Sequence, residues 1–406
     1  MKPLNIVLIT VDCLRADVLT RLQKHGLADG AHIAKLAEKG TRFTNAVTVA
    51  QSTAPSLVSI LTSSYPKTHK VLMNGLSLDK ATGPTLPEVL RSHGYKTSGV
   101  ISAEHLSSPF GINRGFTSYA NNSPFDMVYY FLTKFSIAGK QLSYILNVIR
   151  ERFNIFKTAW TDADKITKRA KRLLKKHHHS PFFLWVHYFD THQYASEQEY
   201  DQKIKYVDMH VGYLLDYLKK LDKLQETLVV FTADHGEAFN EHGHPKHGWC
   251  LYDEVLKVPL ILYSQSRLSA GEVANQVRSI DIAPTILDMA GLPIPLKWEG
   301  KSLLGHINGK TKDDLVVKVI STSGRVNIQC IRDGRWKLLR YPQEEQLFNI
   351  LEDKDERKNV IAENAQVANR LRKDLMDTFD FEASEELVDE SVKRRLRSLG
   401  YFDESL

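Results

Sequence analysis

The sequence predicts an α/β fold with a largely parallel central sheet, helices on both of its faces, and a small antiparallel subdomain near the C-terminal end. Three hydrophobic runs lead to this prediction. Asn5–Val11 is an almost continuous run of β-branched residues and leucine, the pattern of a strand buried on both faces of a parallel sheet. Phe182–Val186 and Thr227–Thr232 have the same pattern, and helical patterns lie between the runs.

The helical patterns fit this alternation. Thr161–His178 begins with capping residues and collects basic residues at its C-terminal end, where the helix dipole favours them. Tyr200–Leu221 is amphipathic at helical spacing. A shorter helix is expected at Ser56–Thr62. In sheets of this kind a functional site lies at the carboxyl ends of the strands.

The character of the sequence changes after Thr311. The next segment reads as short strands joined by tight turns, so we expect a small antiparallel sheet there. A polar helix, Ala362–Met376, and a charged tail, Glu382–Leu399, follow it. We therefore expect a large domain over residues 1–310 and a small subdomain over residues 311–406.

Composition narrows the class of protein. The chain has 406 residues, 42% of them hydrophobic and 25% charged, and a net charge of +6, which are the values of a folded protein with ordinary surface charge. We interpret the basic run Lys165–Lys176 as a solvated helix face, and we expect no nucleic-acid partner.

The aromatic and apolar stretch 124–160 is either a packed helical insertion or a lid or membrane-facing surface over the site.

Cysteine usage and the first residues bear on localisation. The chain has three cysteines, Cys13, Cys250 and Cys330, an odd number at wide spacing, which argues against a disulfide framework and favours a reducing compartment. The run Asn5–Val11 is too short for a spanning helix, and we expect no transmembrane segment. We predict a cytoplasmic protein, with peripheral attachment to a membrane as an alternative.

Carboxylates and imidazoles follow all three hydrophobic runs. They are Asp12 after the first run, His187, Asp190 and His192 after the second, and Asp234 and His235 after the third, with His242, His244 and His247 further along. Such ligands together suit Zn²⁺ or a similar divalent ion. One residue alone is explained as a helix cap or a hydrogen-bonded loop histidine, but three clusters at strand ends favour a metal site.

Thr53 is the candidate nucleophile. It lies just before the expected helix, whose N-terminus favours an anion through its dipole and free N–H groups. Alone, Thr53 is simply an N-cap. Beside a metal its hydroxyl would be activated in the same direction as metal-bound water, whose pKa falls from about 15.7 to about 7.

Sequence blocks along nearly the whole chain resemble the sulfatase branch of the alkaline phosphatase superfamily. The blocks include NIVLITVDCLRAD, AQSTAPSLVSILTSSYP, FGINRGF, PFFLWVHYFDTH, FTADHGEAFNEHG, SIDIAPTILDMAGLP and RLRSLGY. The resemblance implies an alkaline-phosphatase-like three-layer sandwich. It also implies that Asp12, Asp234 and His235 hold a divalent metal, with Thr53 bridging to it as nucleophile.

The resemblance also implies roles for two further histidines. His192 and His247 would hold a second metal together with Asp190, bind the transferred group, or protonate the leaving group. One or two divalent ions are therefore expected, with zinc as the first choice and calcium, manganese and magnesium as alternatives.

Three more residues are candidates for substrate binding. His69 and Lys70 follow the nucleophile helix in a position that resembles the basic pair of the family, and Arg114 lies in the FGINRGF block. For Lys70 and Arg114 the alternative is a surface or structural charge. The partner implied is an anionic ester, with a glycan or a lipid headgroup as the group that carries it.

Two departures from the family pattern decide the expected reaction. Sulfatases carry Cys or Ser in a C-x-P-S-R motif that becomes formylglycine, whereas this chain has Thr53 and Leu57 at the first and last motif positions. Cys13 stands where calcium-type sulfatases carry a second Asp. We therefore expect relatives of the phosphoethanolamine and phosphoglycerol transferases and the phosphodiesterases.

The expected enzyme is a metal-dependent hydrolase or transferase that cleaves a phosphate ester through a covalent intermediate on Thr53. The attack on phosphorus would be in line, with the metal stabilising the developing charge. Two alternatives remain open: a sulfatase that works without formylglycine, and a non-catalytic relative that binds a glycan or a metal.

Overall fold

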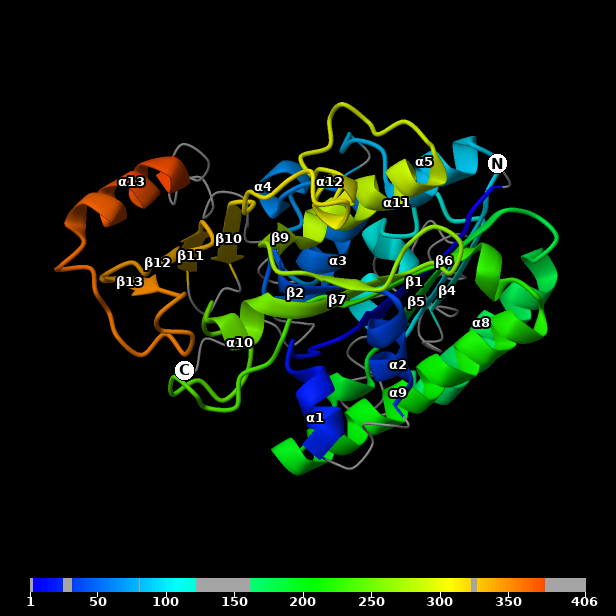
Figure 1. The fold of residues 1–406 in the computed structure, drawn as a ribbon, viewed down its shortest axis with the longest axis horizontal. Helices are drawn as coiled ribbons and strands as arrows, with labels where there is room; N and C mark the ends of the chain where they lie inside the picture. Colours follow the sequence, from blue (N-terminus) through cyan, green and yellow to red (C-terminus); the bar gives the residue numbers. More distant parts are fainter. Residues whose placement is uncertain (1–2, 25–30, 80, 122–160, 323–326, 377–406) are drawn as a thin grey trace, which may run out of the picture.

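The computed structural model describes residues 3–24, 31–79, 81–121, 161–322 and 327–376. Its centre is a large mixed sheet (Figure 1). The strands of this sheet are β1 (Asn5–Val11), β2 (Thr41–Val47), β3 (Lys96–Ile101), β4 (Ser118–Asn121), β5 (Phe182–Tyr188), β6 (Thr227–Ala233), β7 (Lys257–Tyr263), β8 (Gly271–Val273) and β9 (Val277–Arg278). They follow the order β4-β3-β5-β1-β6-β7-β2-β8, and β9 pairs with β2.

Strand β1 lies at the middle of the large sheet, parallel to both of its neighbours. Ile6 is paired with Phe183 of β5 and with Leu228 of β6. Every residue of β1, β5 and β6 is buried, as expected for strands covered on both faces. Only toward the other edge does the direction change, because β7 runs antiparallel to β6 and to β2. The predicted α/β class with a mostly parallel sheet is confirmed.

Helices cover both faces of the large sheet, which gives three layers (Figure 1). The long helices α8 and α9 lie with α1 and α2 along one face, and α3, α5 and α11 lie on the other. The helices on the two faces are α1 (Val18–Lys24), α2 (His32–Lys39), α8 (Ala163–His177) and α9 (Glu197–Lys220) on the first, and α3 (Thr53–Thr62), α4 (Pro66–His69), α5 (Leu86–Ser92), α11 (Ile282–Ala290) and α12 (Leu304–Ile307) on the second. The turn-like helix α10 (Asp253–Leu256) precedes β7.

A second sheet of four antiparallel strands lies beside the first. Its strands, in spatial and sequence order, are β10 (Val317–Thr322), β11 (Asn327–Arg332), β12 (Trp336–Arg340) and β13 (Glu345–Asn349). One face packs in a shared hydrophobic cluster against residues near α10, and the other is covered by α13 (Ala365–Met376). The antiparallel sheet expected after Thr311 is confirmed, and the predicted boundary at residues 310 and 311 falls between α12 and β10.

The predicted elements agree with the observed ones to within a few residues. The first run is β1 without change, and the helix expected at Ser56–Thr62 begins earlier, at Thr53. The stretch 124–160 and the tail Glu382–Leu399 lie outside the described residues. Within the described ranges, no helix is long and apolar enough to cross a membrane.

Candidate active site

The candidate site lies at the carboxyl ends of the central strands. Asp12 follows β1 directly, and Asp234 and His235 follow β6, which is the neighbouring parallel strand. Thr53 is the first residue of α3, which packs on the same end of the sheet. All four side chains are at most 1% exposed, so the structure brings together the whole metal and nucleophile set that the sequence predicts.

The end of β1 has an unusual backbone. Cys13 has a φ of 54°, a left-handed conformation that is uncommon outside glycine. Successive side chains of a strand point to opposite faces, but this turn lets Asp12 and Cys13 face the same region. The Cys13 thiol donates to Asp12 Oδ1 at 3.0 Å, and its backbone N–H donates to Asp234 Oδ1 at 3.1 Å. Backbone strain of this kind is concentrated at functional sites.

Hydrogen bonds fix Thr53 relative to the carboxylates. The Thr53 hydroxyl donates to Asp12 Oδ2 at 3.0 Å. Ser56, one turn along α3, donates through its hydroxyl to the backbone oxygen of Asp234 at 2.6 Å, which ties the helix to the end of β6. The side-chain oxygen of Asn74 accepts the N–H of Ala54 at 2.8 Å. The first turn of α3 is thus held on both sides.

His187 is a neighbour of the carboxylates that the sequence counted among the candidate ligands after the second run, although the resemblance did not place it on the metal. It belongs to β5, and its Nε2 lies 3.5 Å from Asp12 Oδ2. Its Nδ1 lies 2.9 Å from the hydroxyl of Thr10, which also accepts a hydrogen bond from Trp185. The ring of His187 is therefore held in one orientation, toward Asp12.

The two buried carboxylates have opposite pKa shifts. Burial alone would raise the pKa of Asp12, but a hydrogen bond from His187 and the surrounding histidines bring it well below its usual value. Burial, together with the charge of Asp12, raises the pKa of Asp234 well above its usual value. Burial and the neighbouring His247 lower the pKa of His235 to about 4. A cation between Asp12 and Asp234 would offset the repulsion of these two buried, neighbouring carboxylates.

The residues present fit a divalent cation. Asp234 Oδ2 and His235 Nε2 are buried and have no hydrogen-bond partner among the described residues, although the two atoms are only 3.6 Å apart. Buried polar atoms without a partner are costly and need an explanation. Ligand atoms of Asp12, His187 and Asp234 also lie within 4.8 Å of one another. Members of the family implied by the sequence bind a divalent metal, and this donor set provides for one.

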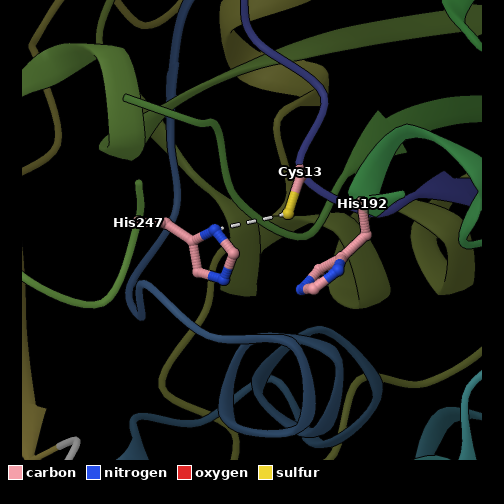
Figure 2. Close-up of side chains that lie close together, drawn as sticks. All are labelled: Cys13, His192 and His247. Atoms are coloured by element: carbon pink, nitrogen blue, oxygen red, sulfur yellow. Dashed lines mark hydrogen bonds between the residues drawn. The ribbon is translucent and has the colours of Figure 1, made fainter. Parts of the chain in front are cut away.

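A second cluster lies on the other side of Cys13. Cys13, His192 and His247 have ligand atoms within 4.8 Å of one another, and Figure 2 shows their side chains converging. The sulfur of Cys13 is 3.5 Å from His247 Nδ1. Both histidines are half-buried, and their ring centroids are 5.3 Å apart. The sequence predicted the two histidines together but not the part of Cys13.

Glu237 is the carboxylate that orients His247. It is 1% exposed, and its two oxygens lie 3.0 and 3.1 Å from His247 Nδ1. Burial alone would lower the pKa of His247 and raise that of Glu237. Their mutual attraction outweighs burial, so the pKa of His247 is raised and that of Glu237 is lowered to about 2.

Asp190 does not join this cluster. Its side chain accepts the backbone N–H of Ala163 at 3.2 Å, at the start of α8, and burial raises its pKa to about 6. The second site predicted from Asp190, His192 and His247 therefore has Cys13 in the place expected for Asp190.

The three residues predicted to bind substrate lie in three different surroundings. His69 is fully buried behind α3, where its Nε2 lies 2.8 Å from the Ser59 hydroxyl and its Nδ1 accepts the N–H of Val71. Burial lowers the pKa of His69 to about 3, so the ring is neutral. Lys70 is exposed at the end of α4.

Arg114 forms an ion pair that stabilises the fold. Its guanidinium donates to both oxygens of Glu88, at 3.2 and 2.9 Å, and also to the backbone oxygen of Asp79. The structure thus gives Arg114 a partner in α5, which is the structural alternative that the sequence left open.

His105 is a further neighbour of the site that the sequence did not point out. It is 7% exposed in the segment after β3, and its ring is 6.1 Å from that of Phe189. Burial lowers its pKa to about 3; the charge of Asp12 opposes this shift, and His192 adds to it. A signal for it was available, since it follows a strand that pairs with β5.

Comparison with known proteins gives family matches over most of the chain. The model described as "Sulfatase" matches residues 4–292, and the one described as "N-sulphoglucosamine sulphohydrolase, C-terminal" matches residues 240–380. The chain is 28% identical over 188 residues to arylsulfatase K of Rattus norvegicus, covering 43% of this chain and 33% of that protein. Over 120 residues it is 34% identical to the N-acetylglucosamine-6-O-sulfatase of Bacteroides thetaiotaomicron, covering 29% of this chain and 21% of that protein.

The matched segments thus span about a third or less of the length of these curated relatives. A longer match, over 93% of this chain and 82% of arylsulfatase K of Xenopus laevis, is 20% identical.

Solved structures share the fold. BT4656, solved in complex with its substrate D-glucosamine-2-N,6-O-disulfate, superposes with a TM-score of 0.69 at 16% identity and covers 100% of both chains. The phosphonate monoester hydrolase of Silicibacter pomeroyi superposes with a TM-score of 0.66 at 18% identity, over 93% of this chain and 96% of that chain. At such identities the likeness is one of fold.

The comparisons correct the expected substrate. The prediction of a phosphate ester is wrong, because the named relatives are sulfatases and the structural neighbours are mostly sulfatases with sulfated sugars. The prediction relied on Thr53 and Leu57, which exclude formylglycine. A hydroxyl in that position does not choose between phosphorus and sulfur, since both esters present a tetrahedral centre with anionic oxygens.

Proposed function

Because the chain belongs to the sulfatase family, we propose that it hydrolyses sulfate esters of sugars and does so without formylglycine. The family match supports the sulfate ester, and the position of Thr53 is the observation that carries the route without formylglycine. Its hydroxyl oxygen is buried at the start of α3, 3.0 Å from Asp12 Oδ2, where the sulfatase motif has its catalytic residue. Threonine cannot be converted into the aldehyde, so its own oxygen is the group available.

In the proposed reaction, Thr53 Oγ1 attacks sulfur in line with the ester oxygen. Asp12 Oδ2 accepts the hydrogen of the hydroxyl, which orients a lone pair of Oγ1 away from the carboxylate. The hydroxyl proton of Thr53 passes to solvent as the S–O bond to the sugar breaks, and the sugar oxygen takes up a proton from solvent and leaves as an alcohol. Water then attacks sulfur, which releases sulfate and returns a hydrogen to Thr53 Oγ1. A divalent cation held by Asp12, Asp234 and His235 would lower the pKa of the hydroxyl and offset the charge of the sulfate.

The donor set favours zinc or manganese over calcium in this position. Calcium takes six to eight oxygen ligands, whereas His235 and the neighbouring His187 supply imidazole nitrogen. Carboxylate with imidazole is a combination common to zinc. The residue that follows Asp12 is Cys13, so a further carboxylate oxygen is missing at that point.

The rim of the site supports a substrate with several negative charges. Lys246 is exposed next to His247, and its ammonium lies 4.9 Å from the ring centroid of Tyr194. It is close enough to influence the titration of His192 and His247. We propose that it contacts a second anionic group of a sulfated sugar, in keeping with the disulfated substrate of BT4656.

The test compares matched esters on the metal-loaded enzyme. We expect a higher kcat/KM for 4-nitrophenyl sulfate than for 4-nitrophenyl phosphate, and turnover of glucosamine 6-sulfate. Thr53→Ala should lower the rate by several orders of magnitude, because it removes the attacking oxygen, and Thr53→Ser should keep part of it. A higher kcat/KM for 4-nitrophenyl phosphate would refute the proposal that sulfate esters are the substrates. Near-normal turnover by Thr53→Ala would reduce Thr53 to a helix cap worth about 1 kcal/mol.

A further inference from the structure

A cleft of about 670 Å³ lies where the large sheet meets the small subdomain. Its walls are formed by residues of α1, β2, β7 and α10, and by residues of β11 and the loop after β13. Thr53, the proposed metal ligands, His192 and His247 do not line it. Pockets that hold small ligands have volumes of about 300–1,000 Å³. The cleft is therefore large enough for a small molecule and is separate from the active site.

Most of the carboxylates along this cleft are already paired with cations of its walls. Such pairs offset the negative charge of the walls and leave their other cations unbalanced. Asp355, in the loop after β13, is the exposed exception. The pairs are Asp17 and Glu241 with Arg15, Asp253 with Arg332, and Glu254 with His242.

Four further cations line the cleft. Among the described residues, Lys257, Lys354 and Arg357 form no ion pair with a carboxylate, although the guanidinium of Arg357 donates to a backbone oxygen. Arg42 has only an ion pair of 3.8 Å with the exposed Glu272, and such surface pairs contribute little. The cleft therefore has an excess of positive charge.

The two cations from the large sheet project from the same face of it. β2 and β7 are antiparallel neighbours, and Arg42 lies opposite Ile261. Lys257 lies four residues before Ile261 on β7, so its side chain points to the same face. Lys257 is half-buried there. Burial lowers the pKa of Lys257, and Arg332 adds to this shift, whereas Asp253 opposes it. An anion in the cleft would offset the repulsion between these cations.

The remaining wall is polar as well. Thr20 and Thr44 bring hydroxyl groups to the cleft, and Asn45 brings an amide. Hydroxyl and amide groups bind a ligand that has hydroxyl groups of its own better than an apolar one, because each buried polar group needs a partner. The volume also exceeds what a lone tetrahedral anion would fill.

We propose that this cleft binds a sugar that carries a sulfate or phosphate group. The anionic group would lie among Arg42, Lys257 and Lys354, since guanidinium and ammonium groups are the usual partners of tetrahedral oxyanions. The hydroxyls of the sugar would contact the threonines and the amide. The proposal concerns binding alone and holds whichever ester the active site cleaves.

Acetylation of lysines, followed by mass spectrometry, reports on the cleft residue by residue. The reaction is carried out on metal-loaded Thr53→Ala, and the ester is quantified at the end to verify that it is intact. Glucose 6-sulfate and glucose 6-phosphate should slow the acetylation of Lys257 and Lys354, by about tenfold at about ten times the Kd. Lys246 reports on the active site in the same sample, and the exposed Lys220 at the end of α9 should not change.

Controls separate recognition from simple screening of charge. Glucose, and sodium chloride at the same ionic strength, should give no protection. Adding Arg42→Met should weaken the protection of Lys257 and Lys354, whereas adding Lys246→Met should leave it unchanged. Unchanged acetylation of Lys257 at about 10 mM of either ester, or equal protection by sodium chloride, would overturn the proposal. Equal protection by inorganic sulfate would overturn the sugar as part of the ligand.

Discussion

Replacing Lys337 by methionine should destabilise the contact between the small sheet and the rest of the protein. Lys337, in β12, is fully buried, and its ammonium lies 2.9 Å from Asp253 Oδ1 and 2.7 Å from Glu356 Oε1. Methionine keeps the length of the side chain but leaves both carboxylates without this cation. Removing one partner from a buried ion pair costs about 3–5 kcal/mol.

The charged groups that remain around Asp253 and Glu356 in Lys337→Met determine how much stability is lost within the range of about 3–5 kcal/mol. Arg332 still pairs with Asp253 at 3.1 Å. Burial raises the pKa of Glu356 to about 7, even though Lys337 lowers it, so Glu356 can take up a proton when the ammonium is gone. Both effects reduce the penalty, and we expect a loss near the lower end, about 3 kcal/mol.

The effect should extend to the metal site. Asp253 begins α10, and the backbone oxygens of Val255 and Glu254 accept the N–H groups of Gly236 and Glu237 at 2.7 and 3.0 Å. Loosening α10 should therefore weaken metal binding at His235, which precedes this pair.

Urea denaturation and metal titration provide the assay. Lys337→Met should lower the free energy of unfolding and also weaken metal binding. The control is Arg335→Met, which removes an exposed pair with Glu352 of 3.5 Å and should change stability by less than about 1 kcal/mol. If the two variants unfold at the same urea concentration, the reasoning about the buried charges is refuted.

Three further predictions concern pH, backbone space and metal. The pKa of His69 is about 3 in the folded chain, against an ordinary value of 6.5. Below about pH 6.5 the His69 side chain therefore takes up a proton in the unfolded chain but not in the folded one, and the free energy of unfolding should fall by up to about 1.4 kcal/mol per pH unit. His69→Gln should make the free energy of unfolding less dependent on pH, which denaturation midpoints measured between pH 7 and pH 5 would show. In Gly236→Ala the new Cβ would lie 2.1 Å from the backbone oxygen of Glu254, so the backbone next to His235 would have to shift. Metal content measured by elemental analysis should therefore fall. Removing metal with a chelator should lower the melting temperature, because the ion binds the folded chain, and a melting temperature unaffected by metal would contradict the site.

Much of the fold and the centre of the site could be predicted from the sequence. Asn5–Val11 was predicted without error because a strand buried on both faces leaves a continuous apolar run. Asp12, Asp234 and His235 were among the candidates expected at one edge of the sheet, because the carboxyl ends of neighbouring parallel strands meet there, and the resemblance to the sulfatase branch selected these three.

Other features depend on contacts that a single sequence does not reveal. The role of Cys13 follows from a left-handed backbone and from His247, 234 positions away. A lone arginine such as Arg114 looks available for a substrate until its partner in space, Glu88, is known. The substrate was predicted wrongly because the type of nucleophile does not specify the central atom of the ester.

The central place of β1 has a consequence for how the chain folds during synthesis. β1 is made before both of its partners, β5 and β6, which begin at Phe182 and Thr227. At about 5–20 residues per second, the ribosome needs roughly ten seconds or more to produce them. Throughout that time an apolar strand with two unpaired edges is exposed, which is the condition that favours aggregation. Chaperones that hold extended apolar segments should therefore bind nascent chains that end before residue 182.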